Sequence, residues 1–100
     1  MNIQHKFCNK TDELSLHKSH HVESLLIIWG AKESMYKWYG KKEVDFRKQM
    51  TVEPFEISQE GRFSATFHKP ELKAEFIMEY QIFEGYVAVW IVDELQISIQ

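Results

Sequence analysis

The sequence predicts an α+β domain in which one main helix packs on a four- to six-stranded antiparallel meander sheet. Apolar residues recur at helical spacing between positions 19 and 39, and apolar and polar residues alternate through most of positions 44–99. Only 4 glycines and 2 prolines interrupt the chain, which favours consecutive strands joined by short turns. With 100 residues and 44% hydrophobic composition, positions 1–100 are expected to form a single domain with a real core.

The first part of the chain, positions 1–18, is the least regular. Ile3, His5 and Phe7 alternate with other residues as in a short strand, and a polar stretch follows them. We therefore expect this region to be irregular or to form an edge strand.

A long helix is predicted for positions 19–39. Ser19 suits the N-cap, and Gly40 suits the left-handed conformation that ends many helices. A strand that ends at Gly30 is a competing interpretation of positions 22–29, because positions 25–29 are rich in β-branched residues, and the sequence leaves both open. The predicted buried face of the helix consists of Val22, Leu25, Ile28, Trp29, Met35, Tyr36 and Tyr39.

Strands are predicted in the second half of the chain. Alternation over positions 44–52 predicts a strand that ends before Pro54. After a turn at positions 58–61, alternation resumes at Phe63 and continues until Pro70 interrupts it. These runs are expected to pair in sequence order, as in a meander.

The clearest predicted element is a hairpin of positions 72–83 and 86–92 around a turn at positions 84–85. The two-residue turn fixes the register, so the two faces can be assigned. The expected core face pairs Ile82 with Val87, Tyr80 with Val89 and Met78 with Ile91. The second face pairs Phe83 with Tyr86, Gln81 with Ala88, Glu79 with Trp90 and Ile77 with Val92. A last short strand is expected at positions 95–99.

The second face of this hairpin is more apolar than a solvated sheet face normally is. One interpretation is a surface for another protein or for a second copy of the chain, since exposed apolar patches usually have partners and aromatic residues anchor them. The other interpretation is that the N-terminal segment folds back over this face as ordinary core. The predicted protein-binding residues are Ile77, Glu79, Phe83, Tyr86, Trp90 and Val92.

Charge is unevenly distributed along the chain. Residues 1–50 carry nine Lys/Arg and six Asp/Glu, a balance of +3, whereas residues 51–100 carry three and nine, a balance of −6. Lysines interleaved with aromatic residues can hold single-stranded nucleic acid through phosphate contacts and stacking. We favour a solvated lysine face instead, because the net charge is −3 and the chain has only two arginines. The nucleic-acid alternative would use Lys32, Lys37, Trp38, Lys41, Lys42 and Lys48.

Histidines cluster before the predicted helix. His17 and His21 would share one helix face, as two metal ligands do, with His20 between them and Cys8 nearby. No known zinc spacing is matched, so we expect a solvated polar segment and no metal site.

Sequence motifs for catalysis are lacking. The chain has no G-x-S-x-G motif and no phosphate-binding glycine loop. Cys8 and His5 on a short strand would point to opposite faces, and Glu75 and Glu79 on a strand would lie roughly 13 Å apart, too wide for a glycosidase pair. We therefore predict no enzyme, no catalytic residue and no cofactor.

These observations favour a non-enzymatic protein-binding module, such as a small inhibitor of the immunity or anti-defence type. Its partner is expected to present a basic surface to the acidic second half of the chain, and a homodimer is a further option. Nucleic-acid binding through positions 32–48 ranks second, and a small-molecule pocket lined by Trp29, Tyr36 and Phe76 ranks third. A cytoplasmic location without membrane contact is expected, because no long apolar run resembles a signal peptide or a membrane span.

Overall fold

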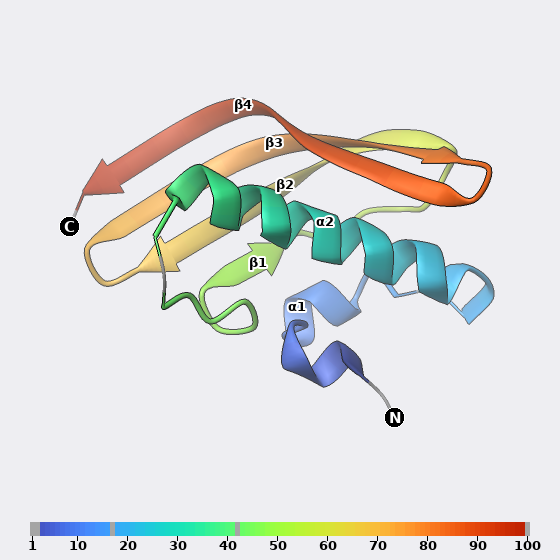
Figure 1. Ribbon diagram of the computed structural model, residues 1–100, viewed down its shortest axis with the longest axis horizontal. Helices are drawn as coiled ribbons and strands as arrows, with labels where there is room; N and C mark the ends of the chain where they lie inside the picture. The colour runs from blue at the N-terminus through green and yellow to red at the C-terminus, as the bar shows by residue number, and fades with distance from the viewer. Residues whose placement is uncertain (1–2, 17, 42, 100) are drawn as a thin grey trace.

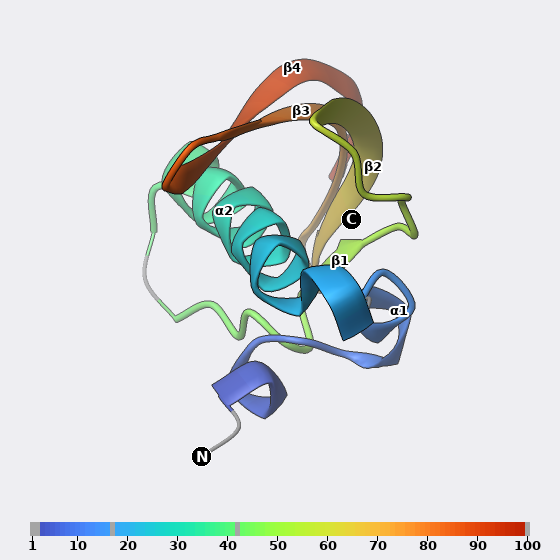
Figure 2. The same cartoon turned by 90° about the vertical axis from the view of Figure 1, so that its right-hand side faces the viewer.

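The computed structural model describes residues 3–16, 18–41 and 43–99 and places one long helix against one sheet (Figure 1). The sheet has the order β1-β2-β3-β4, and each neighbouring pair is antiparallel. Helix α2 (His21–Tyr39) runs along one face of the sheet, which curves over it (Figure 2). The predicted α+β fold, with one main helix on a meander sheet, is confirmed.

Helix α2 includes residues 22–29, so the helical interpretation of this segment is confirmed and the strand interpretation is wrong. At its C-terminal end, Gly40 has the expected left-handed conformation with φ of 72°, and its N–H donates to the Tyr36 carbonyl at 3.0 Å. A short 3₁₀ helix, η2 (Lys18–His20), leads into α2. His20 therefore occupies the N-cap position, one residue after the predicted Ser19.

The face of α2 that packs on the sheet is rotated from the predicted one. Val22, Trp29 and Tyr36, which helical spacing assigns to the buried face, are exposed. The cause is a close approach of the sheet at Gly30, where an added Cβ would lie 2.8 Å from Cγ2 of Val89. This contact turns the aromatic side of the helix away from the sheet. The buried residues of α2 are Ser24, Ile27, Ile28, Ala31, Lys32 and Met35.

The N-terminal segment is helical, so the edge strand predicted from Ile3, His5 and Phe7 is wrong. It forms a 3₁₀ helix, η1 (Ile3–Lys6), and a short helix, α1 (Lys10–Glu13). A capping box starts α1: the Asn9 side chain accepts from the Asp12 N–H at 3.0 Å, and the Asp12 carboxylate accepts from the Asn9 N–H at 2.8 Å. These local bonds satisfy backbone groups that a strand would need to pair elsewhere.

Strand β1 (Met50–Val52) is shorter than the strand predicted over positions 44–52. Residues 46–49 form a turn instead, because one oxygen of the Asp45 carboxylate accepts from the Arg47 and Lys48 N–H groups, both at 3.0 Å. The N–H of Gln49 also donates to the Asp45 carbonyl at 2.8 Å. Such side-chain bonds to nearby backbone favour a turn over a strand.

The remaining strands are β2 (Glu60–Lys69), β3 (Leu72–Phe83) and β4 (Tyr86–Ile99). The predicted hairpin register is confirmed from Phe83 opposite Tyr86 to Met78 opposite Ile91. Beyond that point a register shift pairs Ile77 with Asp93, so its predicted pairing with Val92 is wrong. Two such shifts interrupt the pairing, and the predicted final strand at 95–99 is the continuation of β4.

The two faces of the sheet differ in their surroundings. We call the face turned away from α2, with Ile77, Glu79, Phe83, Tyr86, Trp90 and Val92, the outer face. Residues 3–16 lie beside β1 and α2 (Figures 1 and 2), so the alternative in which they cover the outer face is wrong. The buried residues on the inner face are Phe63, Ala65, Phe67, Ala74, Phe76, Met78 and Tyr80. Of the helices described, none is long and apolar enough to span a membrane.

The contact at Gly30 gives a first prediction. Gly30→Ala should lower the free energy of unfolding, although alanine otherwise favours a helix by about 1 kcal/mol, because the new Cβ meets Val89 at 2.8 and 3.1 Å. Gly30→Ala should cost less stability when it is added to Val89→Ala than when it is made in the parent protein, since the methyl carbon at 2.8 Å is then gone and only the Cβ at 3.1 Å remains. Urea denaturation of all four proteins measures this. A Gly30→Ala variant more stable than the parent protein would contradict the close approach.

Candidate functional site

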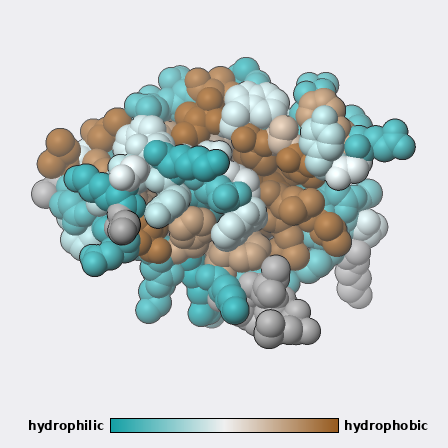
Figure 3. Space-filling view, in the orientation of Figure 1, coloured by the Kyte–Doolittle hydropathy of each residue, from teal (hydrophilic) through white to brown (hydrophobic). Residues whose placement is uncertain are grey.

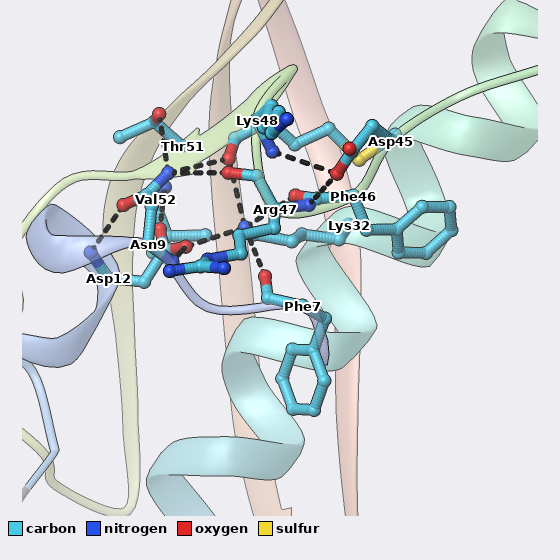
Figure 4. A network of polar contacts seen from close by, with 11 residues as sticks. Phe7, Asn9, Asp12, Lys32, Asp45, Phe46, Arg47, Lys48, Thr51 and Val52 are labelled. Carbon is cyan, nitrogen blue, oxygen red and sulfur yellow. Dashed lines mark hydrogen bonds and ion pairs between the residues drawn. The ribbon is translucent and has the colours of Figure 1, made fainter. Parts of the chain in front are cut away.

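Lys32 lies on α2 with its side chain fully buried, and its ammonium group joins three separate segments (Figure 4). It donates to the Asp12 carboxylate at 2.5 Å and to the backbone carbonyl of Phe7 at 2.6 Å. It also donates to the carbonyls of Phe46 at 2.7 Å and Met50 at 2.9 Å. One cation thus binds the N-terminal segment, the 43–49 loop and β1 to the helix.

Asp12 extends this arrangement on the opposite side (Figure 4). Its second oxygen accepts from the Val52 N–H at 2.7 Å, which fixes α1 to β1. The amide of Asn9 donates to the Met50 carbonyl at 3.0 Å and to Thr51 Oγ1 at 3.1 Å. Among the described residues no buried side-chain nitrogen or oxygen lacks a partner. We call the connected set of Phe7, Asn9, Asp12, Lys32, Phe46, Met50, Thr51 and Val52 the Lys32 network.

The electrostatic state of the pair follows from its surroundings. Burial lowers the pKa of Lys32 below its usual value, and the Asp12 carboxylate acts against that decrease. Four acceptors surround an ammonium that has three protons, so the charged form is well solvated by the protein itself. Lys32 is therefore a structural cation and cannot reach a nucleic acid.

A groove of about 770 Å³ opens beside this network, on the exposed side of α2. The Lys32 network shapes it directly, because the carbonyls of Phe7 and Phe46 bind the Lys32 ammonium while their side chains form two of its walls. Trp29 forms a third wall, one turn before Lys32 on the helix. We call this cavity the α2 groove; its lining consists of Lys6, Phe7, Leu25, Leu26, Trp29, Val44, Asp45 and Phe46.

The walls of the α2 groove are aromatic and in mutual contact. The Trp29 ring lies 5.3 Å from the Phe7 ring, edge to face, and 5.4 Å from the Phe46 ring. Tyr36 extends the row at 5.5 Å from Phe46. Figure 3 shows apolar side chains gathered over the N-terminal half of α2 and the part of β4 beside it. Large exposed apolar areas of this kind mark binding sites.

Two charged side chains line the same groove. Lys6 is exposed, and within residues 3–16, 18–41 and 43–99 no acidic side chain forms an ion pair with it. Asp45 is also exposed, and one of its oxygens is held by the turn described above. The groove therefore combines a largely apolar lining with one ammonium and one carboxylate among its described residues.

The structure brings most of the predicted protein-binding residues together on the outer face. Trp90 Nε1 donates to Glu79 Oε1 at 3.2 Å, and the Phe83 and Tyr86 rings stack at 4.9 Å. Arg62 forms an ion pair with Glu79 at 2.6 Å, which neutralises the acidic residue that the sequence places at the centre of this face. On the outer face Phe83, Tyr86, Trp90 and Val92 are exposed, and a cavity of about 260 Å³ lies beside Trp90.

The predicted nucleic-acid residues do not share one surface. Lys32 is buried, and Trp38 packs edge to face on Phe76 at 4.9 Å while its indole N–H donates to Glu94 at 2.6 Å. Lys37, Lys41 and Lys48 are exposed at different places, and Lys42 lies outside the described residues. The predicted pocket of Trp29, Tyr36 and Phe76 is also wrong as a set, because Phe76 is fully buried in the core.

The histidine and cysteine candidates are not assembled into a site. His20 lies 3.6 Å from Glu23, His21 is exposed, and His17 lies outside the described residues. No group of three or more metal-ligating side chains occurs in the described part of the chain. Cys8 is fully buried, and burial raises its pKa to about 12, with Asp12 adding to the increase. A thiol with such a pKa is a poor nucleophile.

A comparison with protein-family models decides the class of the protein. Residues 1–91 match the family model described as the 4'-phosphopantetheinyl transferase superfamily. The chain belongs to this superfamily. Comparisons with curated proteins and with solved structures gave no match. The match covers every segment that builds the α2 groove and ends within β4.

Membership of the 4'-phosphopantetheinyl transferase superfamily overturns the predicted function. The expectation of a non-enzymatic inhibitor of the immunity or anti-defence type is wrong, because the superfamily is one of transferases. The prediction rested on missing motifs, and transfer of a phosphate-linked group depends on positioning and charge rather than on a protein nucleophile. The sequence analysis also missed Lys6, Phe7, Val44 and Phe46, which only long-range contacts bring together. Two signals for this site were available in the sequence. They are Lys32 within the predicted helix and the N-x-x-D capping pattern of Asn9 and Asp12.

The Lys32 network gives a second prediction, on stability. Lys32→Met should lower the free energy of unfolding by about 3–5 kcal/mol, because it leaves Asp12 charged and without its ion-pair partner inside the protein. The matched control is Lys37→Met, an exposed lysine on the same helix, with an expected change within about 0.5 kcal/mol. Urea denaturation compares the two, and equal effects would rule out a structural role for Lys32.

Cys8 gives a third prediction, on pH. The pKa of Cys8 is raised from 9.0 to about 12 in the folded chain, so above pH 9 the unfolded chain loses a proton that the folded chain keeps. The free energy of unfolding should therefore fall between pH 9 and 12, by at most about 1.4 kcal/mol per pH unit from this group. Denaturation of the parent protein and of Cys8→Ala over this range isolates the contribution. Parallel pH profiles would contradict it.

Proposed function

We propose that this chain acts in the transfer of 4'-phosphopantetheinyl groups and that it holds the group on the exposed side of α2. The observation that carries the proposal is the family match over residues 1–91, which includes every residue of the α2 groove. The groove supports it by its size and lining, because small-molecule sites have volumes of about 300–1,000 Å³ and mostly apolar walls.

The chemistry of the transfer sets two requirements for the site. An acceptor nucleophile attacks the phosphorus of the phosphate-linked group and loses its proton, while the bond from that phosphorus to the leaving oxygen of the donor breaks and the rest of the donor departs with the electron pair. The phosphate must therefore be positioned and its charge stabilised. The α2 groove offers positioning through its rigid aromatic walls. Glu33 and Lys37 follow Trp29 at four-residue steps along the exposed side of α2, so a carboxylate and an ammonium lie one and two turns from the groove. Of these two, the exposed Lys37 ammonium is the candidate for the second requirement, because a cation stabilises a phosphate and a carboxylate repels it.

The outer face of the sheet supports a separate proposal. Exposed aromatic side chains there, above all Trp90 and Tyr86, favour contact with another protein or with a second copy of this chain. Because the two candidate sites lie on opposite sides of the molecule, one pair of variants distinguishes them.

The experiment uses coenzyme A labelled in its pantetheine part, since this compound carries the group that the superfamily name specifies. Labelled donor and the full chain are incubated with a cell extract as the source of acceptor proteins, and protein-bound label is measured. Trp29 and Trp90 are both 40% exposed, so they form a matched pair. Trp29→Glu should reduce transfer at least about tenfold, whereas Trp90→Glu should leave it within about twofold if the groove is the donor site.

The controls make each outcome informative. Circular dichroism and thermal unfolding establish that both variants are folded, as expected for exposed positions. Loss of transfer in Trp90→Glu alone would move the site to the outer face. A parent protein that transfers no label to any protein in the extract would contradict the proposed function.

A further inference from the structure

We propose that the outer face of the sheet binds a proline-rich segment of another protein, with arginine or lysine residues flanking its prolines. This inference goes beyond the transfer reaction and uses the side of the sheet that is turned away from α2. It rests on three properties of the outer face. These are exposed aromatic rings beside a cavity, a strand backbone that is already paired, and carboxylates without ion-pair partners.

The aromatic side chains of the outer face leave an open space between them. Tyr86 and Trp90 are 62% and 40% exposed, and they lie on the same face of β4 with Ala88 between them. Their Cα atoms are separated by four residues of strand, or about 13 Å. The Phe83 ring stacks on the Tyr86 ring at 4.9 Å, and a cavity of about 260 Å³ lies beside Trp90. The short side chain of Ala88 leaves room for a small apolar group between the two rings.

The Trp90 ring is held in position by neighbouring strands. Its Nε1 donates to Glu79 Oε1 at 3.2 Å, and Arg62 Nε donates to the other oxygen of the same carboxylate at 2.6 Å. These bonds link β2, β3 and β4 across the wall of the cavity. An aromatic surface that is fixed before binding loses little entropy when a ligand arrives.

The sheet backbone limits how a partner can bind here. Beneath the cavity, Glu79 and Gln81 of β3 are paired on both sides, with β2 and with β4. A partner therefore cannot add to this face as a strand, and it must bind through its side chains while its own backbone stays solvated. A polyproline II segment meets this condition, because it has no internal hydrogen bonds and its backbone is exposed to water.

Proline also suits the spacing and the chemistry of the two rings. A polyproline II helix rises about 3.1 Å per residue and about 9 Å per turn, so one turn fits between Tyr86 and Trp90. Grooves lined by aromatic side chains are the surfaces that recognise such segments, whose preset conformation lowers the entropy cost of binding.

Unpaired carboxylates determine the charge of the partner. Glu60 and Asp93 are exposed, and their register positions place them on the outer face, one on each side of the row that contains Trp90. Among the described residues, no ion pair includes either of them. The arginine and the lysine on this face, Arg62 and Lys73, are already paired with glutamates. Cationic side chains on both sides of the prolines would therefore complement this surface.

Fluorescence anisotropy with three labelled peptides tests the proposal on the full chain. The peptides are RPPAPPAPPR, EPPAPPAPPE and RSASASASAR, which separate the contribution of proline from that of charge. We expect the arginine-flanked proline peptide to bind at least about tenfold more tightly than either of the others. Its binding should weaken as the salt concentration rises, because exposed charges are screened.

Variants locate the binding site on the outer face. Trp90→Ala should weaken binding of the arginine-flanked proline peptide at least about tenfold. Trp29→Ala is the matched control, because Trp29 is also 40% exposed but lies on α2, and it should change binding by less than about twofold. Glu60→Gln should weaken this peptide about threefold and should reduce the salt dependence of its binding. Circular dichroism establishes that each variant is folded.

Several results would overturn the proposal. They are absence of binding by the arginine-flanked proline peptide, equal binding of all three peptides, and unchanged binding in Trp90→Ala. A dimer of the parent protein in sedimentation experiments that Trp90→Ala dissociates would assign the outer face to a second copy of the chain instead. The transfer assay described above is independent of these measurements, so the proposed function and this inference can fail separately.

Discussion

The buried ion pair of Lys32 and Asp12 is the constraint on which the rest of the structure depends. The sheet and helix α2 could pack through apolar contacts alone, but the N-terminal segment, the 43–49 loop and β1 are all bonded to this one pair, and Asn9 adds further bonds between them. A charged pair in the interior is costly to desolvate, and it is stable here because no buried side-chain nitrogen or oxygen in residues 3–16, 18–41 and 43–99 lacks a hydrogen-bond partner. The same bonds that remove this cost also determine where the groove walls stand, so stability and the candidate site share one set of interactions.

The parts of the fold that local periodicity controls could be predicted from the sequence. The hairpin of β3 and β4 follows from alternation around a two-residue turn, and the end of α2 follows from Gly40. The side of α2 that faces the sheet could not be predicted, since apolar residues surround this helix on most sides and a close contact at Gly30 decides its rotation. Strand-like alternation before Met50 was misleading, because the Asp45 side chain stabilises a turn there.

The candidate site was harder to predict than the fold for a physical reason. Its lining comes from three segments that the sequence separates by 17 residues (8–24) and 14 residues (30–43), and no local pattern joins Lys6, Trp29 and Phe46. Lys32 is the residue that brings them together, and in the sequence it belongs to a run of lysines that suggests a solvated or nucleic-acid-binding face. Its burial reverses that interpretation, because Lys32 is enclosed by the protein and cannot contact a partner molecule.

The bulged pairing of β3 and β4 has a consequence for the behaviour of the protein at high concentration. Strand β4 is at the end of the sheet order and has no neighbour on its far side among the described strands, while Val92, Leu95 and Ile97 are exposed along it. A long, regular, apolar edge strand can pair with a strand of another molecule, and repeated pairing of this kind leads to aggregation. The two register shifts break the regular spacing of N–H and C=O groups along that edge, so a strand from another molecule cannot continue the ladder over its full length. The register shifts in the pairing of β3 and β4 therefore oppose aggregation through the edge of β4.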